Sequence, residues 1–452
     1  MSDYIYILES HLSPGQNRAV AAVQGAAGLS GLNLFLTGGA MRDMLAGFRI
    51  RDLDFVVEGN ALQPVKALAS SGATVLSTDE ARKSANLIFP GGVTAQLATA
   101  RREKPGRNGA KPQVASATIH EDLRGRDFTC NAIALSLTKS SRGLLLDPLN
   151  GLADIERREL RSANPYGFYD DPSRLLRLIR LRVRLGFTVE ERTQVQADHA
   201  RESAVWQSIP PATLGEELRQ IASEDTPSEI LKLLEESGLL AVFSPALAGP
   251  KLNLGGIMKL EKAARLLPDD ASSRTVRLAP FLFVLTEKLS VKERQALSKA
   301  VDLTKAELAQ WQKLEARARK LETTLRSARI RKPSQVYHLV SAAEADEVLF
   351  LLYHSALKPV QERLRNHFQK YLPAVQEITP EEWAQVPGAP GTPKYQKARH
   401  EFISRRLDRR PPKPPVPAPP VAPPPPAPTQ GPGWRGQPGQ TVRRGSGQAW
   451  GQ

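Results

Sequence analysis

Two aspartates, Asp52 and Asp54, have the residue type and spacing that most directly suggest chemistry. Residues two apart in a strand point to the same face, so both carboxylates would lie together. Because like charges held close together repel each other unless a cation joins them, and because carboxylate oxygens suit Mg²⁺, the pair predicts a magnesium site for in-line phosphoryl transfer. An Asp-x-Asp pair alone is better explained as a strand end that faces solvent, so this interpretation depends on the neighbouring residues.

A glycine pair, Gly38 and Gly39, lies upstream between the apolar run 33–37 and a helical stretch. A strand that ends in two glycines and opens a helix leaves backbone N–H groups unobstructed at the helix N-terminus, where geometry and dipole both favour phosphate. Arg42 lies one turn into this helix and can reach the same anion with its fork of donors. Together with the aspartates, the glycine pair favours a phosphate site over a simple turn.

The elements that must position these residues lie in the first 165 residues. Apolar runs at 33–37, 53–57 and 132–137 predict strands, and they alternate with helical segments such as 62–71. From about residue 226 the pattern is helical. There Thr226 and Pro227 predict a helix start, Glu229 completes a capping box, and Gly238 stands where a C-cap glycine belongs. The sequence therefore predicts an α/β or α+β head followed by helices.

The chain is strongly basic, with 62 Lys and Arg residues against 47 Asp and Glu residues and a formal net charge of +15. A surplus of this size suits a protein that binds a polyanion. Part of it lies in residues 405–452, whose proline-rich composition favours an extended chain without a core. We expect a disordered basic tail there. Its Trp434 and Trp450 either stack on single-stranded RNA or belong to a merely solubilising segment.

Several classes of protein are excluded by simple features. Cys130 is the only cysteine, so the chain has no intramolecular disulfide and no cysteine-rich zinc site. The N-terminus has no basic segment followed by an apolar one, and the apolar run 278–285 is far shorter than the ~18 residues that a membrane span needs. We therefore expect a cytoplasmic protein without membrane association.

Residues 38–54 contain a GGxxRD turn followed by Asp-x-Asp, and they resemble the first motif of the class II tRNA nucleotidyltransferase and poly(A) polymerase family, in the polymerase β nucleotidyltransferase superfamily. Three further matches follow in the family's order. Residues 121–132 are similar to RRDFTxNA, residues 147–161 to the motif that links head and neck, and residues 170–180 to EDxxR. Serial agreement of this kind is more specific than any single motif.

The resemblance implies an α+β fold: a polymerase β-like nucleotidyltransferase head with a mixed sheet and helices, then an all-helical neck, body and tail, and a disordered Pro-rich C-terminus. The implied divisions are a leader helix at 1–28, the head at 29–165, a neck with a nucleotide-template helix at 166–240, an RNA-binding body and tail at 241–404, and the disordered basic tail at 405–452.

The resemblance also assigns roles to single residues. Asp52 and Asp54 would be catalytic and would hold Mg²⁺. Asp127 is suited to accept a hydrogen bond from a ribose hydroxyl, and a deoxynucleotide would lose about 1–3 kcal/mol without it. The alternative for this stretch is a surface Arg–Asp pair that precedes a core strand. The full set of implied nucleotide-binding residues is Gly38, Gly39, Arg42, Arg126, Asp127, Asp171, Arg174, Arg177 and Arg180.

A helix is predicted to start at Pro172, with Asp171 as its N-cap. Its arginines form a basic stripe apart from its apolar residues, so an ordinary amphipathic helix is an alternative that can coexist with function. Cytosine and adenine both present an amino donor beside a ring-nitrogen acceptor, so Asp171 beside Arg174 can pair with either base. Guanine and uracil would face acceptor to acceptor and donor to donor, and such a site can reject them by as much as ~10⁴-fold.

The sequence departs from the family pattern at several positions, one of which is Asp170, where the family usually has glutamate. Gly125 stands where the first arginine of RRD is usual, Asn150 replaces a customary glycine, and Thr213 stands where arginine is expected. Gln96 lies where a third carboxylate of the superfamily site would be sought, which leaves the ligand set for a second metal incomplete.

These features predict an RNA 3′-end nucleotidyltransferase, and CCA addition to tRNA with CTP and ATP is the main hypothesis. The RNA 3′-hydroxyl would attack the α-phosphorus and release pyrophosphate. A poly(A) polymerase, or an enzyme that adds only CC or only A, is the alternative within the same chemistry. A fold retained for RNA binding without activity is the third hypothesis, against which the intact Asp52 and Asp54 argue. The oligomeric state is left open.

Overall fold

The computed structural model describes residues 4–104, 113–268, 274 and 277–409 of the 452. Its N-terminal part is built on a seven-stranded sheet in the order β3-β4-β5-β2-β1-β8-β9. Only β2 and β5 pair in parallel, and the other neighbours are antiparallel, so the predicted mixed sheet is confirmed. The strands are β1 Asn33–Thr37, β2 Leu53–Glu58, β3 Thr74–Asp79, β4 Ser84–Phe89, β5 Val93–Thr99, β8 Ala134–Ser136 and β9 Leu145–Leu146.

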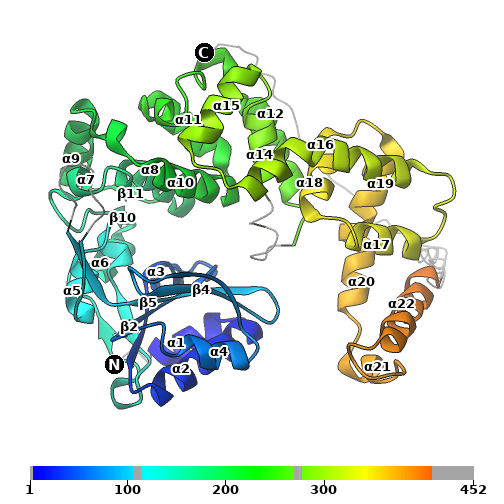
Figure 1. Cartoon of the computed structure of the whole chain (residues 1–452), viewed down its shortest axis with the longest axis horizontal. Coiled ribbons are helices and arrows are strands. Elements are labelled where there is room, and N and C mark those ends of the chain that lie inside the picture. The colour runs from blue at the N-terminus through cyan, green and yellow to red at the C-terminus, as the bar shows by residue number, and fades with distance from the viewer. Residues whose placement is uncertain (1–3, 105–112, 269–273, 275–276, 410–452) are drawn as a thin grey trace, which may run out of the picture. The chain divides into compact units, whose positions relative to one another are not determined.

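Both faces of this sheet are covered. Along β1, Leu34 and Leu36 pack into the main core, whereas Phe35 belongs to a smaller cluster with Ile119 and Leu123 on the opposite face. This alternation follows from the two-residue period of a strand. Helices α1 Tyr4–His11, α2 Pro14–Leu29 and α4 Val65–Ser70 gather on one face (Figure 1), and α5 Ile119–Arg124 lies on the other. Of the two catalytic candidates, Asp54 therefore belongs to a strand that is buried on both sides, and Asp52 directly precedes it.

After residue 165 the described chain is helical, apart from the two-residue strand β11 Thr188–Val189, which pairs in parallel with β10 Glu159–Leu160. A further two-stranded sheet joins β6 Arg101–Lys104 to β7 Gln113–Ser116. The remaining helices are α3 Gly38–Leu45, α6 Gly151–Arg157, α7 Gly167–Asp170, α8 Arg174–Leu185, α9 Glu191–Glu202, α10 Pro211–Ser223, α11 Pro227–Glu236, α12 Leu254–Ala264, α14 Leu278–Leu285, α15 Val291–Ala300, α16 Lys305–Arg326, α17 Pro333–Ser341, α18 Ala345–His354, α19 Lys358–Asn366, α20 Leu372–Gln376, α21 Pro380–Ala384 and α22 Pro393–Asp408.

Several predicted boundaries need correction. The leader contains two helices rather than one, because Ser13 caps α2 by accepting a hydrogen bond from the Gln16 N–H while Pro14 occupies the first turn. The strand expected at 132–137 is limited to β8, since a 3₁₀ turn over Thr129–Asn131 precedes it. The helix expected at 62–71 is the shorter α4.

Two predicted helix starts differ in detail. The capping box at Thr226 does not form: its side chain makes no cap hydrogen bond, and the Glu229 N–H donates to the Thr226 carbonyl at 3.2 Å. The neighbouring Ser228 N–H donates to Glu261 at 2.6 Å. Helix α8 begins at Arg174 rather than at Pro172, since the Asp171 carboxylate accepts from the Ser173 N–H at 3.1 Å and closes a turn before the helix. Gly238 adopts the left-handed conformation after α11 that its predicted C-cap role requires.

At the far end, α22 runs past the predicted boundary at Arg405 to Asp408, whose carboxylate accepts hydrogen bonds from the Ser334 N–H and hydroxyl at 3.0 and 2.8 Å. The rest of the predicted tail, with Trp434 and Trp450, lies outside the described residues. The division of the remaining chain into head, neck and body stays a prediction. No helix in the part of the chain that the structure describes is long and apolar enough to cross a bilayer.

Candidate active site

The glycine pair and Asp54 meet at the point where β1 ends and α3 begins. The Gly39 N–H donates to Asp54 Oδ2 at 3.1 Å. A Cβ added at Gly38, which has a φ of +62°, would lie 3.1 Å from the same oxygen. A side chain there would therefore crowd the carboxylate as well as strain the backbone. The structure thus brings Gly38, Gly39 and Asp54 together as predicted, but it directs one of the N–H groups expected for phosphate at the aspartate.

Asp52 lies just before β2 and is exposed, with a carboxylate that accepts a hydrogen bond from the Thr94 hydroxyl on β5. Burial, together with the nearby charge of Asp52, raises the pKa of Asp54 above its ordinary value. Two neighbouring carboxylates next to a hydroxyl oxygen form a donor set that fits a divalent cation with oxygen preference. The side chains of Asp52 and Asp54 therefore suit the predicted Mg²⁺.

Gln96 is the register partner of Asp54 on β5, which confirms the neighbourhood in which a third carboxylate was sought. Its amide donates to the Asn86 Oδ1 at 3.3 Å on the next strand. Within residues 4–104, 113–268, 274 and 277–409, no group of three or more histidine, cysteine, aspartate or glutamate side chains is arranged to hold a metal. The cation site consequently rests on two carboxylates.

Arg126 approaches the glycine turn from the other side. Its Nε and Nη2 donate to Asp122 Oδ2 at 3.0 and 2.7 Å, and Nη1 lies 3.6 Å from where a Cβ of Gly38 would be. Asp122 stands four residues earlier on α5 and was missed, although an Asp–Arg spacing of i,i+4 is a recognisable helix pair. Because Asp122 fixes one side of the guanidinium, the other side is presented beside Asp54, where a phosphate would lie.

Arg42 faces inward. Its Nε and Nη2 donate to Asp43 Oδ1 at 2.9 and 2.7 Å, its Nη1 donates to Asn131 Oδ1 at 2.7 Å, and only 4% of the residue is exposed. All three nitrogens are thus engaged. Arg42 is buried beside the glycine turn, with Nη2 3.5 Å from where a Cβ of Gly39 would be, and its predicted contact with phosphate stays a prediction. In the structure, Arg42 links α3 to Asn131, and Asn131 supports the turn that carries Asp127.

Asp127 is 8% exposed and accepts three hydrogen bonds. Oδ1 accepts from the Phe128 N–H at 2.7 Å and from Asn131 Nδ2 at 2.9 Å, and Oδ2 accepts from Arg177 Nη1 at 3.0 Å. Burial opposes ionisation, but the Arg177 guanidinium and the Asn131 amide hold the pKa of this carboxyl well below its usual range. Because a carboxylate oxygen has two lone pairs, Oδ2 keeps one acceptor position for a ribose hydroxyl.

The predicted base-selecting pair lies at the start of α8. Arg174 donates from Nη1 to the Arg126 carbonyl at 3.2 Å and from Nη2 to the Gly125 carbonyl at 3.1 Å. Its Nε has no hydrogen-bond partner and lies 3.7 Å from Asp171 Oδ2. An acceptor and a donor therefore stand side by side, as the prediction requires. Gly125, which lacks the family's arginine, contributes its carbonyl to this arrangement.

Arg177 and Arg180 are bound by Glu217 of α10 and by Glu224, which directly follows that helix. Arg177 Nε donates to Glu217 Oε1 at 3.0 Å, and Arg180 donates to Glu217 Oε2 at 3.1 Å and to Glu224 Oε1 at 3.4 Å. Arg180 is 6% exposed, so its predicted contact with a base does not agree with its position inside this network. The pairing of Glu217 and Glu224 with these arginines was not predicted, since nothing in the local pattern of either glutamate indicates which distant arginine it meets.

The departure at Asn150 has a structural explanation. Asn150 has a φ of 58° and a ψ of 38°, which is the left-handed conformation that asparagine tolerates best among residues with a side chain. The next residue, Gly151, cannot be replaced by a residue with a side chain, because a Cβ there would lie 2.1 Å from the Thr129 carbonyl oxygen. The motif that links head and neck therefore keeps the glycine that close packing demands.

Comparison with known proteins identifies relatives of this chain. A family model described as the Poly A polymerase head domain matches residues 34–161. The chain is 36% identical over 209 residues to the A-adding tRNA nucleotidyltransferase of Aquifex aeolicus, covering 46% of this chain and 25% of that protein. It is 35% identical over 268 residues to the CC-adding tRNA nucleotidyltransferase of Deinococcus radiodurans, covering 58% of this chain and 68% of that protein.

A solved CCA-adding enzyme in an apo form has the same fold. It matches with a TM-score of 0.52 and 23% identity, covering 91% of this chain and 96% of that one. The likeness extends over nearly the whole of both chains, whereas the match to the first of the two relatives spans a quarter of that relative. The fold is therefore shared well beyond the segment in which the sequences agree.

Proposed function

Because the chain belongs to the class II tRNA nucleotidyltransferase and poly(A) polymerase family, as its 35% identity over 68% of a CC-adding relative shows, we propose that it extends RNA 3′ ends with nucleotides. The proposed reaction is CCA addition to tRNA with CTP and ATP, with release of pyrophosphate. One observation carries the proposal: Asp54, the Gly38–Gly39 turn and Arg126 converge at one point at the edge of β1 and β2.

Asp52 and Asp54 would hold Mg²⁺ in this proposal, since their carboxylates are the oxygen ligands at that point. When bound, such an ion supplies charge neutralisation at the phosphate and lowers the pKa of a coordinated hydroxyl. Arg126 would bind the phosphate chain with the face of its guanidinium that Asp122 leaves open. Remaining N–H groups of the α3 N-terminus would add donors to the same phosphates.

The sugar and the base would be held by the segment that follows. Asp127 would accept a hydrogen bond from a ribose hydroxyl on the free side of Oδ2, while Arg177 keeps that carboxylate ionised and oriented. Asp171 and Arg174 would pair with the amino group and ring nitrogen of cytosine or adenine. The carbonyls of Gly125 and Arg126 fix the plane of the Arg174 guanidinium, which supports such selection.

The helices after residue 240 would hold the acceptor and T arms of tRNA by charge and shape, without a sequence code. We place the reaction in the cytoplasm, because tRNA, CTP and ATP are available there. The A-adding and CC-adding activities of the two relatives make a partial enzyme the second candidate, since both resemble this chain at similar identity.

The test is incorporation by the purified full chain with Mg²⁺. The substrates are tRNA without its 3′ end, tRNA that ends in CC, and an unstructured RNA, each with CTP, ATP or both. Completion of CCA on the first tRNA is expected. Addition that stops at CC, or that occurs only on the tRNA ending in CC, would identify a partial enzyme, and long A tracts would identify a poly(A) polymerase. The absence of incorporation on every RNA would refute the proposed activity.

A further inference from the structure

Arg51 stands directly before Asp52 and is bound by the turn between α10 and α11. Its Nη1 donates to Glu224 Oε2 at 2.6 Å, and its Nη2 donates to Asp225 Oδ2 at 3.1 Å. The arginine side chain is 17% exposed and the Glu224 side chain 3%. The segment that leads through Asp52 into β2 and Asp54 is thus held by a largely buried ion pair with a turn more than 170 residues away in sequence.

Glu224 also serves a second element. Its other oxygen accepts from Arg180 Nη1 on α8 at 3.4 Å. Burial opposes the ionisation of Glu224, but the guanidiniums of Arg184, Arg51 and Arg180 lower the pKa of its carboxyl below the ordinary value. Burial, together with the charges of Arg42 and Arg51, lowers the pKa of Arg184 to about 10, so these guanidiniums disfavour one another. One buried carboxylate therefore holds together arginines from β2 and α8 that would otherwise repel.

The ion pairs continue to the nucleotide site. Arg180 shares Glu217 with Arg177, and Arg177 binds Asp127, so acids and bases alternate without interruption from Arg51 to Asp127. This series of contacts joins the start of the catalytic strand to the residue proposed to hold the ribose. A displacement of Glu224 would therefore change the position of α8 relative to Asp52 and Asp54.

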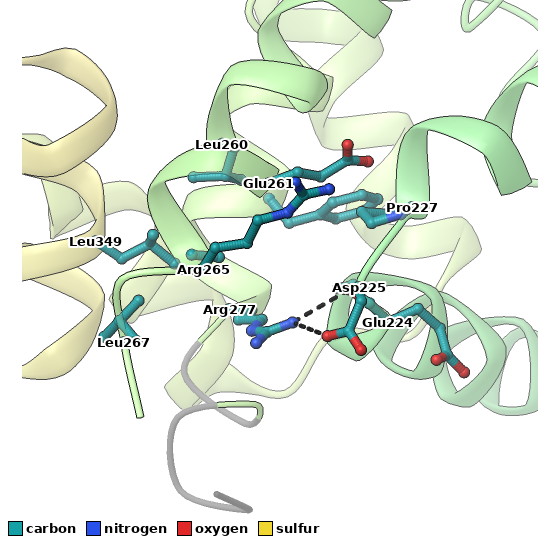
Figure 2. A pocket seen from close by; sticks show the side chains of 12 residues that line it. Glu224, Asp225, Pro227, Leu260, Glu261, Arg265, Leu267, Arg277 and Leu349 are labelled. Atoms are coloured by element: carbon teal, nitrogen blue, oxygen red, sulfur yellow. Dashed lines mark hydrogen bonds and ion pairs between the residues drawn. The ribbon is translucent and has the colours of Figure 1, made fainter. Parts of the chain in front are cut away.

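The turn is fixed from the other side as well. Arg277 Nη1 donates to the carbonyls of Ser223 and Glu224 at 3.3 and 3.2 Å and to Asp225 Oδ1 at 3.2 Å. Figure 2 shows Arg277 directed at Asp225 beside a cavity of about 360 Å³, whose lining includes Leu260, Leu267 and Leu349. Neither Asp52 nor Asp54 lines this cavity. The cavity is therefore connected to the catalytic residues only through the position of the turn.

We propose that Glu224 is a positioning residue, which sets the catalytic strand β2 against the nucleotide-selecting helix α8 through Arg51 and Arg180. The inference rests on the proposed function, because it concerns where the base and the catalytic carboxylates lie relative to each other. A shift of about 1 Å at a reacting centre can cost ~10²-fold in rate, so a modest movement of α8 is enough to matter. The effect would appear in turnover and base choice, and not in RNA affinity.

The test compares Glu224→Gln with a control substitution in a similarly buried ion pair of the helical body. Asp346 is 7% exposed and binds Arg317 Nη2 at 2.5 Å, so Asp346→Asn removes a similarly buried carboxylate far along the chain from the site. We expect Glu224→Gln to lower kcat about 10- to 100-fold and to raise UTP incorporation relative to CTP, with the Kd for tRNA changed less than twofold. Asp346→Asn should lower the melting temperature comparably and leave kcat and base choice unchanged.

Arg51 provides the second variant, which keeps the test valid if Glu224→Gln does not fold. Arg51→Lys keeps the charge but cannot bind both carboxylates in a fork, so it should retain more activity and discrimination than Arg51→Gln. If Glu224→Gln or Arg51→Gln is folded and matches Asp346→Asn in kcat and in base choice, the positioning role is refuted. Wild-type protein is assayed in parallel on tRNA without its 3′ end, because inactive wild-type protein refutes the proposed function instead.

Discussion

Replacement of Asp127 by asparagine tests how much the alternating ion pairs contribute to folding. The substitution keeps the shape of the side chain but exchanges one acceptor oxygen for an amide donor. In the wild-type protein, Oδ1 of Asp127 accepts from Phe128 and Asn131, and Oδ2 accepts from Arg177. In either orientation of the asparagine, its amide N–H group would therefore face a donor. At least one hydrogen bond of the buried site must therefore be lost.

The size of the loss can be bounded from these contacts. A hydrogen bond to a charged group contributes about 1.5–3 kcal/mol, and removal of one partner of a buried ion pair costs about 3–5 kcal/mol when the other charge is left alone. Arg177 is not left alone, because Glu217 remains 3.0 Å away. We therefore expect Asp127→Asn to lower the free energy of unfolding by about 2–4 kcal/mol at pH 7.

The pH dependence follows from the pKa of Asp127. Since this pKa is depressed in the folded protein, the carboxylate stabilises the fold in full above the ordinary carboxyl pKa of about 3.9, and that stabilisation is lost as the pH falls through the native pKa. The difference between wild type and Asp127→Asn should consequently be the same at pH 7 and pH 5.

Urea unfolding followed by circular dichroism at both pH values measures this difference. Asp198→Asn is the control, because Asp198 has a 37% exposed side chain and pairs with Arg201 at 3.1 Å on the surface of α9, where a pair contributes about 0.2–1 kcal/mol. A loss below about 1 kcal/mol for Asp127→Asn at pH 7, or a loss that halves between pH 7 and pH 5, would refute the assigned contacts.

Three further outcomes are expected. Asp54→Asn should abolish nucleotide incorporation and leave the affinity for tRNA unchanged. It should also raise the free energy of unfolding in metal-free buffer, because a carboxyl with a raised native pKa destabilises the fold when it is ionised. Retained activity or a lower free energy of unfolding would contradict this. Gln96→Glu should lower the Mg²⁺ concentration for half-maximal incorporation, because residue 96 lies in register beside Asp54, and an unchanged or higher concentration would argue against the site. Gly151→Ala should cost at least about 2 kcal/mol in urea unfolding, while Gly255→Ala, with open space at its Cβ, should be neutral or stabilising; similar effects of both would contradict the close packing at Gly151.

The central residues of the site could be predicted from the sequence, because short local patterns determine the elements that carry them. An apolar run that ends in Gly38 and Gly39, followed by Asp52 and Asp54, specifies a strand, a helix N-terminus and a second strand, and short connections place these side by side. The structure confirms the strands and the meeting of Gly39 with Asp54. Periodicity also separates the basic stripe of α8 from its apolar face.

The partners of that stripe could not be predicted in the same way. Glu217 and Glu224 lie about 40 residues after the arginines that they bind, and only the packing of α10 against α8 decides the pairing. In the same way, nothing in the sequence around Ser228 indicates that its N–H donates to Glu261 of a different helix. Local patterns indicate that a donor or acceptor is present, whereas the tertiary fold decides which partner it meets.

Four of the five arginines of α8 have a consequence for how RNA would find this protein. Arg174, Arg177, Arg180 and Arg184 are each matched by a carboxylate of the protein, so together they act at a distance as dipoles, whose field decays faster with distance than that of a free charge. RNA that lies beyond a Debye length of about 8–10 Å would therefore be attracted by the other lysines and arginines that make up the net positive charge of the chain. Counterion release on binding, and with it the salt dependence of affinity, should follow those residues and depend little on the four paired arginines of α8.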